Sequence, residues 1–289
     1  MRLVTYLHHG MTGVGVFDPD TARIKPLDLG DGRHIPDMLT LIREGLDAVV
    51  PSVMRAALPL IEVDLLAPIH RPARNVFCVG KNYRRHAEEF AQSGFDSSSS
   101  SAVPEHPVIF TKVPESVIGD RETIRYPAGL SNALDYEAEL AVVIGRSGHG
   151  IARDEAMDYV FGYTIVNDVT ARDWQQRHHQ WFLGKSFDTF CPMGPVLVTA
   201  DELDPSALDI RCWVNDELRQ EANTRDLIFD IPTLIATISA GITLQPGDVI
   251  ATGTPEGVGA GFNPPRFLER GNEVVIEIEG IGRLVNDVF

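Results

Sequence analysis

The sequence predicts a β-rich mixed α+β fold, and three observations support that class. Strand-like apolar runs dominate from Asn75 onward, helical patterns are few and short, and the two do not alternate regularly. A doubly wound parallel sheet is therefore not expected, because it requires strands and helices in alternation. A chain of 289 residues can form one large domain with a small additional unit. We place the boundary in "APIHRPARN", which contains two prolines, and predict domains at 1–70 and 71–289.

The first 70 residues predict a small β/α unit. The segments "RLVTYLHH", "TGVGVFD" and "ARIKPLDL" are short strand candidates separated by glycine and aspartate. A helix is expected after Pro36 and Asp37, because apolar residues then recur along one side. These apolar residues are Met38, Leu41, Ile42, Leu46 and Val49.

The larger part predicts many strands and few helices. Strands are expected in "NVFCVG", "PVIFTKV", "LDYEAELAVVIG", "GYTIVNDV", "GPVLVT", "DIRCWVND", "GDVIATG" and "NEVVIEIEGIGRLVNDV". Helices are expected in "KNYRRHAEEFAQ", "ARDEAMDYV", "TARDWQQRH" and "IPTLIATISAG", the last with Asp230 as its N-cap. The serine run at 97–101 is too polar to pack and predicts a mobile loop.

Charge and cysteine content narrow the class of protein. The net charge of −16 argues against binding to nucleic acid or to an anionic membrane surface, since both require a basic surface. No apolar run approaches 18 residues and no signal-peptide pattern opens the sequence, so we expect a cytoplasmic protein. Three cysteines without paired spacing predict neither a disulfide framework nor a zinc site.

Two glutamates open the most apolar run of the chain. Glu137 and Glu139 are two residues apart in a strand candidate, so their side chains share a face. One interpretation is a solvated face on an edge strand. The other is a buried divalent cation held by both carboxylates, since unpaired buried charges are costly. Asp168, at the end of the run in "GYTIVNDV", is the candidate for a third ligand to Mg²⁺ or Mn²⁺.

Several long motifs together resemble the fumarylacetoacetate hydrolase family. They are "KNYRRHAEEF", "DYEAELAVVIG", "NDVTARDWQ", "FLGKSFDTFCPMGP" and "GDVIATGTPEGVG", in that order across about residues 75–289. The resemblance implies a β-roll-like catalytic domain, a homodimer, and a Mg²⁺ or Mn²⁺ ion, with Ca²⁺ in some relatives. It assigns the metal to Glu137, Glu139 and Asp168, and it implies a small 2-oxo acid as substrate.

The resemblance also assigns the remaining site residues. His86 and Glu89 share a helical face, and the family implies that His86 takes a proton while Glu89 orients its ring. Lys185 would direct its charge at a substrate carboxylate or oxyanion. Two alternatives stay open for His178, His179 and Trp181, which either shape the pocket or merely cover it. Substrate-binding positions are expected at Arg172, Gln175 and Thr254, with Arg84 and Lys81 as weaker candidates.

The predicted reaction is hydrolysis of a C–C bond in an acylpyruvate or diketo acid, through a metal-stabilised enolate. A decarboxylase of oxaloacetate-like acids needs almost the same residues, as does an isomerase or dehydratase, so these remain alternatives. A third possibility is an inactive binding protein in which the ion is structural. Metal removal separates that case, since a structural ion predicts a large fall in melting temperature.

Overall fold

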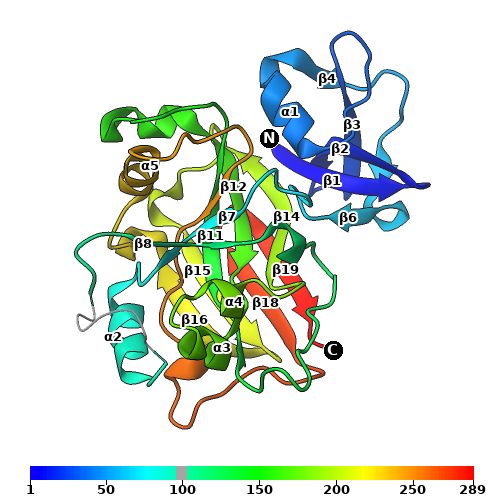
Figure 1. Cartoon of the computed structure of the whole chain (residues 1–289). Coiled ribbons are helices and arrows are strands. Elements are labelled where there is room, and N and C mark those ends of the chain that lie inside the picture. The colour runs from blue at the N-terminus through cyan, green and yellow to red at the C-terminus, as the bar shows by residue number, and fades with distance from the viewer. Residues whose placement is uncertain (96–102) are drawn as a thin grey trace.

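A long mixed sheet connects the N-terminal unit to the remainder of the chain (Figure 1). The computed structural model describes residues 1–95 and 103–289, so the predicted mobile loop at 97–101 lies outside the described residues. The strand order along the sheet is β4-β3-β2-β1-β14-β12-β11-β17-β7-β8. The two parts are joined by antiparallel pairing of β1 (Arg2–His8) with β14 (Cys191–Thr199).

The N-terminal unit contains the strands and the helix that its sequence predicts. Helix α1 (Met38–Glu44) begins after Asp37, whose Oδ1 accepts a hydrogen bond from the Thr40 amide at 2.7 Å. Because β1 continues the main sheet, the domain boundary at residue 70 remains a prediction. The other strands of this unit are β2 (Met11–Asp18), β3 (Arg23–Leu29), β4 (Val49–Pro51), β5 (Leu58–Pro59) and β6 (Asp64–Leu66).

The strand that carries the glutamate pair lies inside the main sheet. β11 (Ala138–Ile144) is flanked by β12 (Val160–Asn167) and β17 (Val249–Ala251). All seven residues of β11 are buried, as expected for a strand covered on both faces. The interpretation of a solvated edge strand is therefore wrong. Beyond β17, the parallel strand β7 (Val76–Gly80) and then β8 (Val108–Lys112) end the sheet.

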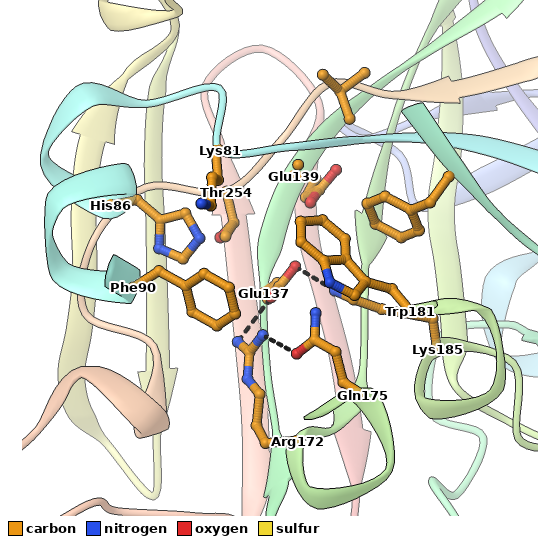
Figure 2. Close-up of a pocket in the computed structure, with 13 residues that line it drawn as sticks. Lys81, His86, Phe90, Glu137, Glu139, Arg172, Gln175, Trp181, Lys185 and Thr254 are labelled. Carbon is orange, nitrogen blue, oxygen red and sulfur yellow. Dashed lines mark hydrogen bonds and ion pairs between the residues drawn. The ribbon is translucent and has the colours of Figure 1, made fainter. Parts of the chain in front are cut away.

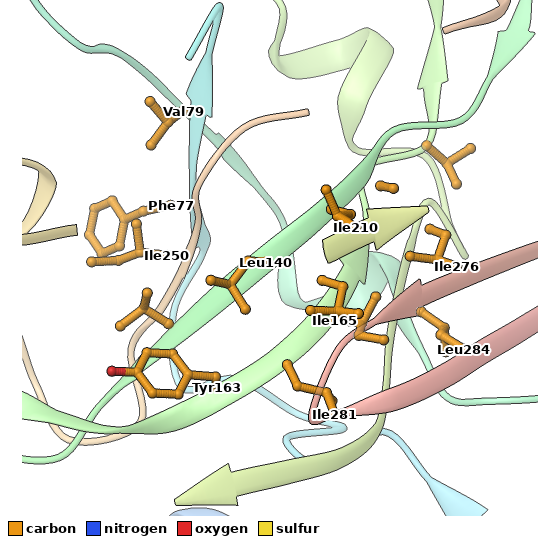
Figure 3. Packing of buried hydrophobic residues seen from close by; sticks show 14 of the residues in the cluster. Phe77, Val79, Leu140, Tyr163, Ile165, Ile210, Ile250, Ile276, Ile281 and Leu284 are labelled. Atoms are coloured by element: carbon orange, nitrogen blue, oxygen red, sulfur yellow. The ribbon is translucent and has the colours of Figure 1, made fainter. Parts of the chain in front are cut away.

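A second, antiparallel sheet packs against the main one and encloses the larger hydrophobic core (Figure 3). Leu140 and Ile165 from the main sheet face Ile210, Ile276 and Leu284 from the second. Sheets dominate this architecture and helices are short, so the predicted β-rich α+β class is confirmed. The strands of the second sheet, in spatial order, are β16 (Glu217–Asn223), β15 (Asp209–Val214), β18 (Glu273–Ile278) and β19 (Gly282–Asp287).

Short helices surround the two sheets, and most occur where the sequence predicts them. The Oδ1 of Asp230 accepts from the Thr233 amide at 3.0 Å and caps the last helix, as predicted. The segment predicted as a helix in "ARDEAMDYV" is instead a 3₁₀ helix, Arg153–Tyr159. No described helix is long and apolar enough to span a membrane. The α-helices after α1 are α2 (Arg84–Gln92), α3 (Arg172–Arg177), α4 (Phe182–Lys185), which was not predicted, and α5 (Ile231–Ser239).

Candidate active site

Three buried carboxylates converge at one end of β11 and β12. Glu139 lies within β11, Glu137 directly precedes that strand, and Asp168 directly follows β12. One carboxylate oxygen of each lies within 4.8 Å of the others. We call these residues the acidic trio. The structure thus brings together the three residues singled out in the sequence, and their function as metal ligands remains a proposal.

The single strand predicted across 134–145 is interrupted beside the acidic trio. A two-residue break separates β10 (Leu134–Asp135), which pairs with β13 (Thr170–Ala171), from β11. The Glu137 carbonyl accepts from the Asp168 amide at 2.9 Å. The Glu137 amide donates to a side-chain oxygen, Asn167 Oδ1, at 3.1 Å. These bonds hold the first and third acidic residues together.

Three buried cationic side chains contact the acidic trio. Lys185 Nζ lies 2.8 Å from Glu137 Oε2 and 2.7 Å from Asp168 Oδ2. Lys112 Nζ lies 2.6 Å from Asp168 Oδ1. Arg172 Nη2 lies 2.7 Å from Glu137 Oε1, as an ion pair without hydrogen-bond geometry. Lys112 was missed in the sequence, where a lone lysine at the end of a strand gives no local signal.

These charges affect the two glutamates in opposite directions. Burial by itself raises the pKa of a carboxyl group. At Glu137, the cations of Lys185 and Arg172 outweigh burial and lower the pKa to about 2. At Glu139, burial and the carboxylates of Asp168 and Glu137 raise the pKa well above its usual range. The charged form is therefore favoured at Glu137 and disfavoured at Glu139.

Asp135 is a further buried acid that sequence reasoning missed. Its Oδ2 accepts from Arg172 Nε at 2.8 Å and from the Ala260 amide at 3.0 Å, while its Oδ1 accepts from the Gly259 amide at 2.6 Å. Arg172 Nη1 also donates to Gln175 Oε1 at 3.1 Å. Asp135 therefore holds Arg172 beside the acidic trio and connects it to residues 253–261, which we call the glycine-rich loop.

A narrow cavity lies beside the acidic trio (Figure 2). The space open to the centre of a water molecule is about 10 Å³, which is room for about one water. Arg84 is exposed and does not line the cavity, whereas Lys81 and the unassigned Trp181 do. His178 and His179 are also exposed. The predicted site residues that line the cavity are His86, Glu137, Glu139, Arg172, Gln175, Lys185 and Thr254.

His86 and Glu89 lie side by side on α2, with the histidine facing the cavity (Figure 2). The distance from His86 Nδ1 to Glu89 Oε2 is 3.5 Å, an ion-pair distance without hydrogen-bond geometry. The Glu89 oxygens accept from the Gly257 amide at 3.1 and 3.2 Å. A Cβ at Gly261 would overlap the Glu89 carboxylate, so any larger residue there would displace this side chain. The glycine-rich loop thus positions Glu89, and Glu89 faces Nδ1 of His86.

The acidic trio fits a hard divalent cation. Its donors are buried carboxylate oxygens, the ligand type that Mg²⁺, Mn²⁺ and Ca²⁺ prefer. Glu139 Oε2 accepts from the Gly253 amide at 2.8 Å, but no salt bridge reaches Glu139 within the described part of the chain. A buried carboxylate without a cationic partner is costly in its charged form, and a bound cation would remove that cost.

Comparison with known proteins identifies the family. The family model described as "Fumarylacetoacetate (FAA) hydrolase C-terminal" matches residues 75–289. The chain belongs to the fumarylacetoacetate hydrolase family. It is 52% identical over 230 residues to oxaloacetate tautomerase YisK of Bacillus subtilis (strain 168), covering 79% of this chain and 74% of that protein. It is 43% identical over 282 residues to the human mitochondrial oxaloacetate tautomerase FAHD2A, covering 96% and 84%.

Solved structures of the fumarylacetoacetate hydrolase family share the whole fold. Maleylpyruvate hydrolase from Sphingobium sp. SYK-6, solved in complex with manganese(II) ion and pyruvate, is 33% identical with a TM-score of 0.77. The similarity covers 100% of this chain and 98% of that one. The predicted family is thus confirmed. Because the two sequence relatives are named tautomerases, the comparisons favour the isomerase alternative over the predicted C–C hydrolysis.

Proposed function

We propose that the protein is a metal-dependent keto–enol tautomerase of oxaloacetate-type 2-oxo acids. The observation that carries this proposal is the placement of His86 and Lys185, which face one buried cavity from α2 and α4 (Figure 2). Tautomerisation needs a base beside a carbon–hydrogen bond and positive charge beside a carbonyl oxygen. Similarity to two oxaloacetate tautomerases supports this choice among the reactions open to the family.

In the proposed reaction His86 transfers one proton between carbon and oxygen. Nδ1 faces Glu89, so Nε2 is the nitrogen that takes the proton from C3 of the 2-oxo acid. The C–H electron pair becomes the C2=C3 double bond, and the carbonyl pair moves onto the oxygen. The imidazolium then returns the proton to that oxygen, which completes the enol. Glu89 stabilises the imidazolium by its charge while it exists.

Other cavity residues bind and orient the substrate in this proposal. Lys185 places a buried positive charge where negative charge develops on the oxygen. Gln175 and Thr254 offer polar side chains from opposite sides of the cavity. The Arg172 guanidinium is already bound by Asp135, Gln175 and Glu137. It therefore supplies positive charge from a fixed position in the cavity wall and is not free to close over a substrate.

The proposed cofactor is Mg²⁺ or Mn²⁺, held by Glu137, Glu139 and Asp168. When bound, such an ion supplies Lewis-acid polarisation of the substrate carbonyl and lowers the energy of the enolate. The burial and oxygen-only composition of the trio support an ion of this type. The manganese reported with the related maleylpyruvate hydrolase is consistent with it.

The decisive experiment follows the enol form of oxaloacetate by ultraviolet absorbance after the enol is dissolved in buffer. With Mg²⁺ and protein, the enol signal should decay much faster than in buffer, and EDTA should abolish the acceleration. His86→Ala should lose the acceleration and keep the fold by circular dichroism. No acceleration with either Mg²⁺ or Mn²⁺ would refute the proposed function.

The same samples separate the rival reactions. A coupled assay for pyruvate detects decarboxylation of oxaloacetate, since tautomerisation leaves the carbon skeleton intact. Incorporation of solvent ¹⁸O into a product carboxylate detects hydrolysis of an acylpyruvate. Pyruvate release faster than enol decay would favour the decarboxylase, and ¹⁸O incorporation without enol decay would favour the hydrolase.

A further inference from the structure

Three aromatic rings close the cavity over the acidic trio. Trp181 packs edge-on against Phe110, with ring centroids 5.2 Å apart, and edge-on against Phe90 at 6.2 Å. All three line the cavity, and Trp181 is 8% exposed. In Figure 2 the indole lies beside the glutamates, on the side of the cavity opposite His86 and Phe90. The indole is therefore a wall of the site.

The main chain is adapted to the Trp181 ring. A Cβ at Gly80 would overlap the six-membered ring of the indole. Gly80 ends β7 with a negative φ, so backbone conformation gives no reason for glycine there, whereas the close approach of the ring does. The indole thus fills space that any other residue at position 80 would occupy.

The wall opposite Trp181 is held by the fold. Helix α2 follows Asn82, whose side-chain amide donates to the Thr252 carbonyl at 2.7 Å and to the Phe229 carbonyl at 3.0 Å. Since the cavity has room for about one water, the indole limits the space that is left between the two walls.

We propose that Trp181 sets the size limit of the substrate, so that the site accepts short 2-oxo dicarboxylates and rejects 2-oxo acids with a bulky group on C3. This inference rests on the proposed function. The indole packs against the Gly80 backbone, and the cavity that it lines has room for about one water. A C3 carboxylate is small and finds buried positive charge there, whereas an aromatic ring on C3 needs the volume that the indole occupies.

Trp181 is bonded through its backbone to a functional residue, so a substitution of the ring can also affect Lys185. The Trp181 carbonyl accepts a hydrogen bond from the Lys185 amide at 3.1 Å, in the first turn of the short helix α4. A Cβ at Gly184 would overlap the Gln175 backbone, so α4 packs closely on α3. Substitution of the ring therefore has to be compared with a milder variant that keeps an aromatic side chain.

The test compares oxaloacetate with phenylpyruvate, whose C3 carries a phenyl ring. For Trp181→Ala, the ratio of kcat/KM for phenylpyruvate to kcat/KM for oxaloacetate should rise about 10-fold or more, the effect of relieving one steric clash in a pocket. Trp181→Phe should give an intermediate rise. The control is Trp213→Phe, because Trp213 lies on β15 and does not line the cavity. This variant should leave the ratio of kcat/KM values unchanged. A ratio within 2-fold of wild type in both Trp181 variants would overturn the inference.

A binding readout keeps the inference separate from the proposed function. The chain has three tryptophans, so Trp174→Phe/Trp213→Phe leaves Trp181 as the sole indole. Its fluorescence should change when oxalate is added with Mg²⁺, and no change at saturating oxalate would overturn the placement of the ring at the ligand. If wild type binds oxaloacetate but does not tautomerise it, the proposed function fails. In that case the size limit is tested by binding alone. The affinity for phenylpyruvate relative to that for oxaloacetate should then rise about 10-fold or more from wild type to Trp181→Ala.

Discussion

Lys112→Met offers a test of the charge network that is independent of any activity. The Lys112 side chain is fully buried, and its Nζ contacts Asp168 Oδ1 at 2.6 Å and the Val169 carbonyl at 3.0 Å. Removing one partner of a buried ion pair costs about 3–5 kcal/mol, because the remaining charge is left buried. Asp168 retains Lys185 at 2.7 Å, so we expect the lower end of that range, about 3 kcal/mol.

This loss translates into a measurable shift of the melting temperature. For chains somewhat smaller than this one, each kcal/mol shifts Tm by about 2–4 °C, so Lys112→Met should melt about 6–12 °C below wild type in EDTA. Methionine keeps most of the side-chain volume, so cavity formation contributes little. Differential scanning calorimetry or fluorimetry measures the shift directly. Lys25→Met, at a half-buried position of β3, is the matched control and should shift Tm much less.

A divalent ion should compensate part of the Lys112→Met loss. At a concentration 100 times its Kd, a ligand that binds only the folded protein stabilises it by about 2.7 kcal/mol. The ion also supplies positive charge to Asp168, so the Tm gap between variant and wild type should be smaller in Mg²⁺ than in EDTA. Two results would show that the Lys112–Asp168 contact does not stabilise the site. One is a fall in Tm for Lys112→Met no larger than that for Lys25→Met. The other is a Tm gap between Lys112→Met and wild type that is the same in Mg²⁺ and in EDTA.

The remaining predictions concern metal binding and proton transfer. Glu139→Gln should weaken Mg²⁺ binding by calorimetry, because it removes one charged ligand from a buried site. Burial and the neighbouring carboxylates raise the pKa of Glu139, so Mg²⁺ competes with a proton for this carboxylate, and the Kd should tighten by up to about 10-fold per pH unit as pH rises toward that raised pKa. A Kd that does not change with pH contradicts this. His86→Ala should lower kcat by about 10²–10⁴ without changing Mg²⁺ affinity, whereas Glu89→Gln should cost less, since it acts through the ring. EDTA should abolish turnover with a modest loss of Tm, and a collapse of Tm would indicate a structural ion.

The acidic trio could be predicted from sequence because its signal is local. Two glutamates at the start of the most apolar strand conflict with burial unless a cation is present, and Asp168 follows the neighbouring apolar run. The edge-strand alternative could be rejected only with the sheet order, which depends on pairing between distant segments. The break after Asp135 could not be predicted either, because the Glu137 amide there bonds to the side chain of Asn167, which is 30 residues away in the sequence.

Residues that reach the site from elsewhere in the fold were missed for the same reason. Lys112 ends the strand that closes the sheet, and nothing near it in the chain indicates that Asp168 lies within 2.6 Å. Arg84 stays a prediction as a substrate-binding residue. It is two residues from His86, and on a helix that spacing places two side chains on different faces. The structure accordingly shows Arg84 exposed and His86 buried.

Charge balance in the site gives a reason to expect an anionic substrate. The buried groups in mutual contact are four acids and three cations, which leaves one negative charge when all are ionised. A dication would convert that excess to one positive charge, and the carboxylate of a 2-oxo acid would compensate it. Oxaloacetate should therefore bind more tightly with Mg²⁺ than in EDTA, and equal affinity in both would show that the side chains alone bind the substrate carboxylate.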